Sequence, residues 1–176
     1  VLGGVGSDRT LYNLDVLWEP LERLFARYPR LRLRLVGAGR DGRQLPPFEQ
    51  VRYSSLPSYT QAEMIDEVLK FDIGLFPMQD VEASRVRGVL KATVYMSGEA
   101  AVVCSPVGQC ADLVKDGVNG MLAATPEEWE RKLEALVLDA ELRRKIARAG
   151  LATVRAGYTV ERSFSLLRGV MEEVTK

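Results

Sequence analysis

The sequence predicts an α/β fold: a doubly wound parallel sheet of about six strands with helices on both faces, in a single domain over residues 1–176. Short apolar segments alternate with amphipathic helical segments along the whole chain, and this order is typical of parallel sheets. The length of 176 residues fits one domain, and 47% hydrophobic residues are enough for a core.

The predicted strands are short, and turn residues bound them. Residues 1–5 contain two glycines and end at Gly6, and residues 73–76 stop at Pro77. Residues 31–36 alternate Leu with Arg, which is typical of a strand near the edge of a sheet, where one side is partly solvated. The remaining strands are predicted at residues 51–54, 101–105 and 120–123.

The predicted helices carry apolar side chains at intervals of three and four residues. The first covers about residues 11–28 and ends before Pro29. Thr60 and Glu63 form a capping box that predicts one helix start, and Thr125 followed by proline predicts another. Further helices are predicted at residues 89–97, near residue 111, and at residues 141–156 and 160–174.

The composition excludes several functional classes. Lys plus Arg and Asp plus Glu each number 24, so no overall charge favours nucleic acid or an anionic membrane. Histidine is absent, which excludes Ser-His-Asp and Cys-His catalysis and His-ligated zinc. Cys104 and Cys110 lack the C-x-x-C spacing, so we expect buried thiols in a reducing cytoplasm. Because Val1 already lies in a strand, we expect the chain to be a piece of a longer protein.

Ligands of open parallel sheets bind beyond the carboxyl ends of the strands, where loops meet helix N-termini. Four such loops are informative, at residues 3–9, 37–40, 85–91 and 105–109. Their glycines match neither G-x-G-x-x-G nor the P-loop, which argues against dinucleotide oxidoreductases and P-loop NTPases. Asp8 lacks the neighbouring acids that a flavodoxin-like receiver domain needs.

Residues 85–91 form the best candidate anion site. Arg85, Arg87 and Lys91 surround Gly88 at the start of a predicted helix, and a diphosphate needs such N–H groups and cationic donors. A solvated basic loop explains the same residues equally well, so both interpretations stay open at this point. Asp112 likewise suits either a contact to a sugar hydroxyl or a charge at a helix start.

Together with the sequence patterns given next, these loops resemble the C-terminal half of group 1 retaining glycosyltransferases. The resemblance covers the full chain. The family pattern L-V-G-x-G is found at residues 35–39, and K-A-x-x-Y-M-A-x-G-x-P-V-V-x-S corresponds to residues 91–105. G-G-x-x-E-x-V-x-D-G-x-N-G-x-L corresponds to residues 108–122, with Gln109 for the second glycine and Asp112 for the glutamate. Further matches near the end are Trp129, Leu142, Arg143, Gly150 and Tyr158.

The resemblance implies the Rossmann-like half of a GT-B fold, which binds a UDP- or GDP-sugar and supplies its hexosyl group to a glycan, lipid or small-molecule acceptor. It places the donor diphosphate at Arg87, Gly88, Val89, Leu90 and Lys91, beside a phosphate loop at Gly6, Ser7 and Arg9. It places the nucleoside at Gly37, Tyr53, Ser55 and Leu56, and the sugar side at Glu82, Gly108 and Asp112. No metal or cofactor is implied, because cationic side chains and a helix N-terminus take the charge of the departing diphosphate.

The implied partners are the nucleotide sugar and an N-terminal acceptor domain that would precede Val1, with no nucleic acid. The full enzyme is expected to serve polysaccharide biosynthesis in the cytoplasm, with any membrane association through that other half. We expect the present chain to bind nucleotide or nucleotide sugar weakly and not to transfer sugar by itself.

Departures from the family pattern favour an alternative, a non-catalytic module of the same fold with a degraded donor site. Many members carry an E-x7-E pair around the phosphate loop, where this chain has Val86 and Val94, and Glu82 is the nearest upstream substitute. Glu99 stands at a family glycine, so a positive φ there would strain the backbone. An epimerase of GT-B architecture is disfavoured, since such enzymes depend on histidine.

Overall fold

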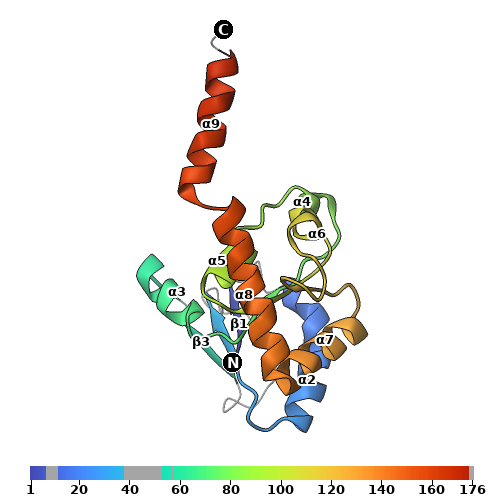
Figure 1. The fold of residues 1–176 in the computed structure, drawn as a ribbon. Coiled ribbons are helices and arrows are strands. Elements are labelled where there is room, and N and C mark those ends of the chain that lie inside the picture. The colour runs from blue at the N-terminus through green and yellow to red at the C-terminus, as the bar shows by residue number, and fades with distance from the viewer. Residues whose placement is uncertain (7–11, 38–52, 57, 175–176) are drawn as a thin grey trace.

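Six short parallel strands form the centre of the molecule in the order β3-β2-β1-β4-β5-β6, and helices cover both faces of this sheet (Figure 1). The computed structural model describes residues 1–6, 12–37, 53–56 and 58–174, with the backbone alone for residues 12 and 53–55. The arrangement confirms the predicted doubly wound α/β fold, because the chain builds the sheet outward from β1 in both directions.

The strands lie close to their predicted positions. Their bounds are β1 Leu2–Val5, β2 Leu33–Val36, β3 Tyr53–Leu56, β4 Ile73–Phe76, β5 Ala101–Cys104 and β6 Met121–Leu122. β2 is second from the edge, as the alternation of Leu and Arg indicates. β6 is shorter than predicted because it pairs only with Val103 and Cys104 of β5.

The helices also follow the predicted order. Their bounds are η1 Tyr12–Leu17, α2 Trp18–Arg27, α3 Gln61–Val68, α4 Glu82–Arg85, α5 Leu90–Ser97, α6 Gln109–Leu113, α7 Pro126–Leu138, α8 Ala140–Gly157 and α9 Val160–Val174. The first predicted helix is divided into the 3₁₀ segment η1 and α2, because Pro20 has no N–H to donate to the carbonyl four residues earlier. The short helix α4 lies where the sequence predicts only a polar loop.

Two helix starts show the predicted caps. The Thr60 hydroxyl accepts a hydrogen bond from the Glu63 N–H at 3.3 Å, and the Glu63 carboxylate accepts one from the Thr60 N–H at 2.7 Å. The Thr125 hydroxyl accepts from the Glu128 N–H at the start of α7. These local signals fix where α3 and α7 begin.

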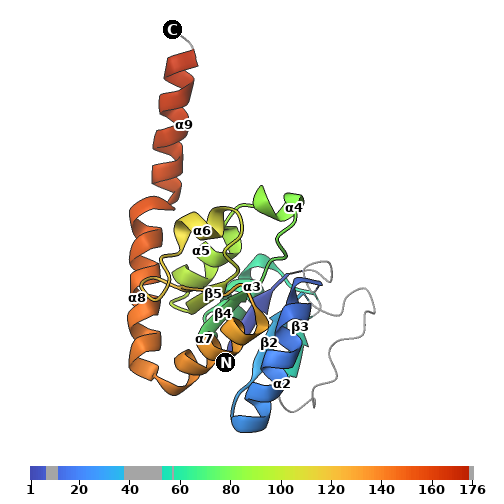
Figure 2. The ribbon, with the colours of Figure 1, turned by 90° about the vertical axis from the view of Figure 1, so that its right-hand side faces the viewer.

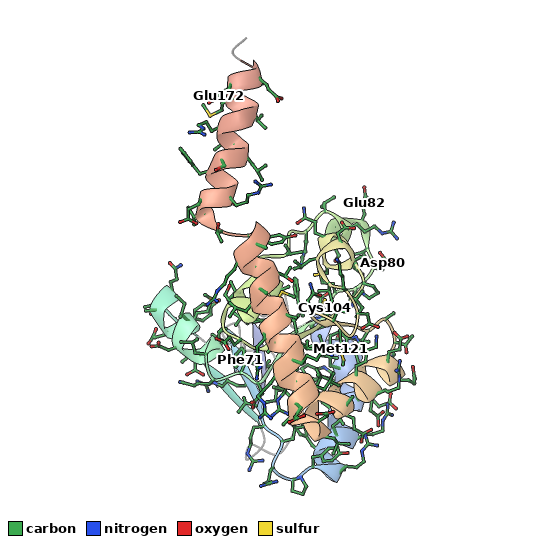
Figure 3. The ribbon with its side chains drawn as sticks, viewed as in Figure 1. Phe71, Asp80, Glu82, Cys104, Met121 and Glu172 are labelled. Carbon is green, nitrogen blue, oxygen red and sulfur yellow. The ribbon has the colours of Figure 1, made fainter. Side chains whose placement is uncertain are left out.

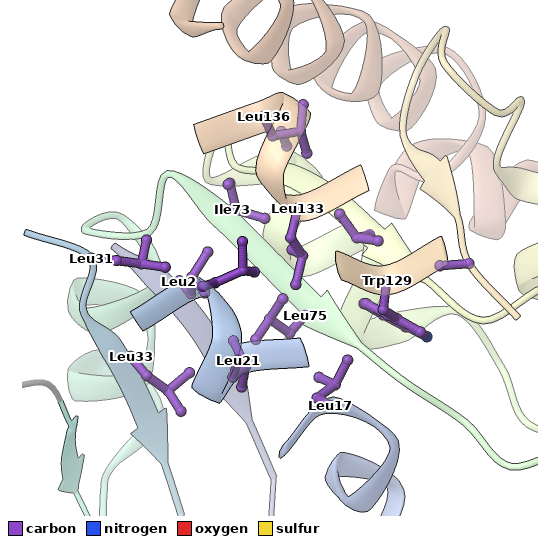
Figure 4. Packing of buried hydrophobic residues seen from close by; sticks show 14 of the residues in the cluster. Leu2, Leu17, Leu21, Leu31, Leu33, Ile73, Leu75, Trp129, Leu133 and Leu136 are labelled. Carbon is purple, nitrogen blue, oxygen red and sulfur yellow. The ribbon is translucent and has the colours of Figure 1, made fainter. Parts of the chain in front are cut away.

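One face of the sheet packs against η1, α2 and α7 (Figure 4). The fully buried side chains between them include Leu17, Leu21, Trp129 and Leu133, which lie on Leu2, Leu75 and their neighbours in the strands. At the rim of this layer, Arg23 and Arg27 of α2 form ion pairs with Glu130 of α7 at 2.5 and 2.6 Å.

The other face packs against α3, α5 and α6. Tyr95 and Met96 of α5 are fully buried against strand residues such as Val102. α8 contributes to both cores, with Ile146 packed in the first and Val154 in the second.

The last helix, α9, extends away from the body of the domain (Figures 1 and 2). It contains no buried residue, although its sequence is amphipathic. Its apolar side chains are exposed, among them Val160, Phe164, Leu167, Met171 and Val174. Within the described part of the chain, no helix is both long and apolar enough for a transmembrane span.

Candidate functional site

The strand order reverses at β1, which lies between β2 and β4. β1 pairs with β4 only at Leu2 and Gly3. Beyond that point the Val5 N–H donates a buried 2.7 Å hydrogen bond to the Tyr95 hydroxyl of α5. The β1–β4 ladder therefore ends before the carboxyl end of β1, and such a switch point is where open α/β sheets bind ligands.

A glycine directly follows each of the strands β1 and β2 at this edge of the sheet. The Gly6 N–H donates to the Val36 carbonyl at 2.8 Å, and the Gly37 N–H donates to the Leu56 carbonyl at 2.7 Å. Gly37 has φ +88°, and a Cβ there would lie 2.4 Å from the Gly6 carbonyl oxygen. Only glycine fits this contact, so the backbones after β1 and β2 lie side by side.

The start of α5 faces this edge without a side-chain cap. Val89 caps the helix without a side-chain hydrogen bond, and the first turn contains no acidic residue. The first N–H groups of an α-helix have no partner within the helix, and the helix dipole adds positive potential there. Gly88 and Leu90, which flank the cap, are exposed, whereas Val89 is buried.

Lys91 adds a cation beneath this turn. Its ammonium lies 5.8 Å from the centroid of the Phe76 ring, at the end of β4. Burial, together with the nearby charge of Arg87, lowers the pKa of Lys91 from 10.5 to about 8. A partly buried cation beside a second cation is stabilised when an anion binds between them.

Arg85 has a different role from the other two cations. Its guanidinium donates to the Asp80 carboxylate at 2.7 Å, and this bond lowers the pKa of Asp80. Arg87 is exposed beside Gly88. The predicted group of three cations therefore consists of the pair Arg87 and Lys91 around the turn, with Arg85 held by Asp80.

The turn between β5 and α6 approaches α4 closely. Gly108 has φ +56°, and a Cβ there would lie 2.8 Å from the Arg85 carbonyl oxygen. The Ser105 hydroxyl accepts a 3.0 Å hydrogen bond from the Met78 N–H, which ties the loops after β4 and β5 together. Both loops are thus held at one end of the sheet, next to the start of α5.

The predicted acidic residues are more peripheral. Glu82 is exposed in the first turn of α4, and Figure 3 shows it near Asp80 at the outer edge of the molecule. Asp112 lines a hollow of about 320 Å³ together with Lys115, Asn119 and Tyr158. This hollow lies between α6 and the end of α8, so a role for Asp112 at the donor sugar stays a prediction.

Some predicted positions cannot be placed in the site. Ser7 and Arg9 lie outside the described residues. Tyr53 and Ser55 belong to β3, but their side chains also lie outside the described part. Leu56 accepts the hydrogen bond from the Gly37 N–H with its carbonyl oxygen. The nucleoside contacts therefore stay predictions.

A larger hollow, of about 740 Å³, lies at the opposite end of the sheet, where the strands begin. Val1, Tyr28, Leu31, Asp72 and Arg143 line it. Its carboxylate, Asp72, forms ion pairs with the Val1 ammonium and with Arg143, the latter at 3.9 Å. The loops that the sequence singles out are at the other end.

Cys104 and Cys110 are buried free thiols, as predicted. The hydrogen bond with the Cys110 thiol, together with burial, raises the pKa of Cys104, so it does not behave as a reactive thiolate. The described residues contain no cluster of three or more His, Cys, Asp or Glu that could hold a metal ion.

The sequence model of the family described as "Glycosyl transferases group 1" matches residues 1–139. The chain belongs to this family. Comparison with curated proteins gave no match. The match covers every strand and the helices up to α7, so the domain described above is a glycosyltransferase domain.

Solved structures show the same fold. The C-terminal domain of the group 1 glycosyl transferase LpcC from Francisella tularensis has a TM-score of 0.68 at 19% identity, over 90% of this chain and 86% of that one. A glycosyltransferase from Rickettsia africae has a TM-score of 0.77 at 15% identity, over 99% and 48%. HepE from Anabaena, solved in complex with UDP, has a TM-score of 0.72 at 17% identity, over 97% and 48%. The chain thus spans about half of the latter two and is one half of a GT-B fold.

In this glycosyltransferase domain the positions of the expected acidic pair are apolar. Val86 is 82% exposed on the loop before α5, whereas Val94 is partly buried and packs against the second core. Glu99 has φ +57°, which confirms the expected strain at a family glycine. The domain has the cations of residues 85–91 but lacks a carboxylate at both positions.

Sequence reasoning missed two side chains of this site. Tyr95, which fixes the end of β1, lies within the family string, but nothing in that string indicates a hydrogen bond to a strand 90 residues away. Gln109 stands out as a departure from a family glycine, but only the fold shows which loop it faces. Both contacts depend on tertiary structure.

Proposed function

We propose that this glycosyltransferase domain binds a nucleoside diphosphate sugar, a UDP- or GDP-sugar, at the carboxyl end of the sheet. The observation that carries this proposal is the turn of Arg87, Gly88, Val89, Leu90 and Lys91, which combines a helix start that has no side-chain cap with two cations next to the switch point. A diphosphate carries two or more negative charges and accepts hydrogen bonds at every oxygen, so it fits such a turn.

In the proposed reaction a hexosyl group passes from the donor to a glycan, lipid or small-molecule acceptor, with retention at the anomeric carbon. The diphosphate leaves as an anion, and Arg87, Lys91 and the start of α5 would stabilise the charge that develops on it. We propose that no metal is required, because these groups supply the positive charge at the departing oxygen.

Known structures support the donor class. HepE of Anabaena was solved with UDP and, separately, with UDP and glucose. The TarM G117R mutant of S. aureus was solved with UDP and other ligands, at a TM-score of 0.75 and 15% identity. These ligands belong to those proteins, and the shared fold makes UDP the first nucleotide to test here.

The acceptor would be bound by a second domain. The chain spans only 48% of the Rickettsia and Anabaena structures, and the apolar face of α9 is exposed, so both observations support a further partner for this domain. We propose a cytoplasmic enzyme of polysaccharide biosynthesis, and the buried free thiols suit a reducing compartment.

Titration with UDP, GDP and ADP tests the donor proposal. We expect UDP or GDP to bind with a micromolar dissociation constant and to stabilise the fold by about 2.7 kcal/mol at 100 times that constant. Arg87→Ala and Lys91→Ala should abolish the stabilisation, and Arg144→Ala, an exposed cation on α8, should preserve it. Equal responses of all three variants would contradict the proposal.

The second candidate is a non-catalytic module of the same fold. Val86 and Val94 favour it, because they stand where the family resemblance places carboxylates. The same titration separates the two functions. No response to any of the three nucleotides would favour the non-catalytic module.

A further inference from the structure

Gly108 holds the beginning of α6 against the phosphate loop. A Cβ at this position would lie 2.8 Å from the Arg85 carbonyl oxygen and 2.9 Å from that of Ser84. Real Cβ atoms do not approach backbone so closely, and the φ of +56° also requires glycine. The next residue, Gln109, is therefore fixed beside the segment that leads from α4 to α5.

Gln109 reaches that segment with its side chain. Its Oε1 atom lies 3.8 Å from the position that a Cβ of Gly88 would occupy. The side chain is otherwise exposed, and it makes no hydrogen bond to a described residue. A carboxamide thus lies against the glycine of the proposed diphosphate turn, within reach of a molecule bound there.

The side chains of residues 86–91, all of which the structure describes, do not offer the same chemistry. Val86 and Leu90 are 82% and 74% exposed and apolar. Arg87 and Lys91 are cations, and they match the charge of a diphosphate. Gln109 carries no charge, donates two hydrogen bonds and accepts others, which suits a neutral hydroxyl group that both donates and accepts.

We infer that Gln109 is a specificity-determining residue that hydrogen-bonds a hydroxyl group of the transferred sugar. This inference rests on the proposed function, because it needs a nucleotide sugar in the turn of residues 87–91. In this arrangement Arg87 and Lys91 bind the diphosphate of any donor, and Gln109 distinguishes a nucleotide sugar from the free nucleotide. Since Val86 carries no carboxylate, the Gln109 carboxamide is the uncharged polar group that lies against Gly88.

Calorimetric titration of the 176-residue chain and its variants tests this assignment. The probes are UDP with UDP-glucose and UDP-N-acetylglucosamine, and GDP with GDP-mannose. Gln109→Ala should weaken binding of the preferred nucleotide sugar about threefold to tenfold, the range of one neutral hydrogen bond, and leave the free nucleotide within about twofold. Arg144→Ala, an exposed position near the start of α8 and the opposite end of the sheet, is the control, and thermal unfolding checks that each variant is folded.

The other outcomes overturn the inference. Equal weakening of sugar and free nucleotide would assign Gln109 to the diphosphate, and unchanged binding would remove it from the site. Tighter binding by Gln109→Ala would show that the side chain obstructs the turn. If the unmodified chain binds no nucleotide, the proposed function fails, and the inference fails with it.

Discussion

At the scale of single residues, Lys91 sets the charge of the proposed diphosphate turn. Burial and the charge of Arg87 lower its pKa to about 8. The lowered pKa means that burial of the charged form costs folding free energy below pH 8, and that this cost disappears as the proton is lost above it. A bound anion raises the pKa of Lys91 again, because it stabilises the ammonium form.

Nucleotide binding should therefore weaken as the pH rises through the pKa of Lys91. If the bound diphosphate keeps Lys91 charged, the dissociation constant of UDP or GDP should rise about tenfold between about pH 7 and pH 9. Calorimetry at several pH values measures this change. Lys91→Arg should flatten the profile, because a guanidinium stays charged throughout that range. A flat profile for the unmodified chain would show that Lys91 does not bind the anion.

Tyr95 and Glu99 show two further single-residue effects in the same part of the chain. The Tyr95 hydroxyl satisfies the Val5 N–H where the β1–β4 ladder ends, so the strand end is held without a neighbouring strand. Glu99 adopts φ +57° directly after α5. α5 therefore lies between a turn open to ligands and a strained connection to β5.

At the scale of elements, α5 joins the core to the site. Its buried side chains, including Tyr95 and Met96, pack on the sheet, and its first turn carries the proposed diphosphate contacts. A helix held by the core gives those N–H groups a fixed direction, so binding costs little reorganisation.

In contrast to α5, the helix α9 buries none of its residues. Isolated helices of about this length are marginal in water, and α9 lacks packing that would stabilise it. Its apolar face contributes nothing to the two cores of the domain.

Deletion of residues 160–176 should therefore leave the free energy of unfolding in urea within about 0.5 kcal/mol. Val154→Ala is the control, since Val154 of α8 is 7% exposed and packs in the second core. That substitution should cost about 1–3 kcal/mol. A comparable loss after the deletion would show that α9 packs on the domain.

At the scale of the whole molecule, the proposed donor contacts lie at one edge of the sheet, where the strands end. The proposed groups would bind the diphosphate and the sugar. The Rickettsia and Anabaena structures are about twice as long as this chain, which covers 48% of each. We therefore expect the 176-residue chain to bind a nucleotide sugar without transferring it.

An assay with radiolabelled UDP-glucose or GDP-mannose and mixed glycan and lipid acceptors checks this expectation. The labelled sugar should stay on the nucleotide, at a protein concentration where calorimetry detects nucleotide binding. Labelled product that depends on Lys91 would contradict it, and would place the acceptor site within this domain.

Much of the fold was predictable because its signals are local. Alternating apolar segments located all six strands, and side-chain caps located the starts of α3 and α7. The division of the first helix was missed, although Pro20 is visible in the sequence, and α4 was missed because four residues carry no periodicity. The exposure of α9 was also not predictable, since an amphipathic pattern shows a suitable face and not what covers it.

The amino-acid order alone determined the class of fold, the family and the cations of residues 85–91, because each depends on residue type and spacing along the chain. Only the tertiary structure decided which groups face one another: Arg85 with Asp80, Tyr95 with Val5, and Gln109 with Gly88. The latter two contacts join segments that are distant in sequence, and their geometry depends on how the helices pack on the sheet. Spacing along the chain contains no information about that packing.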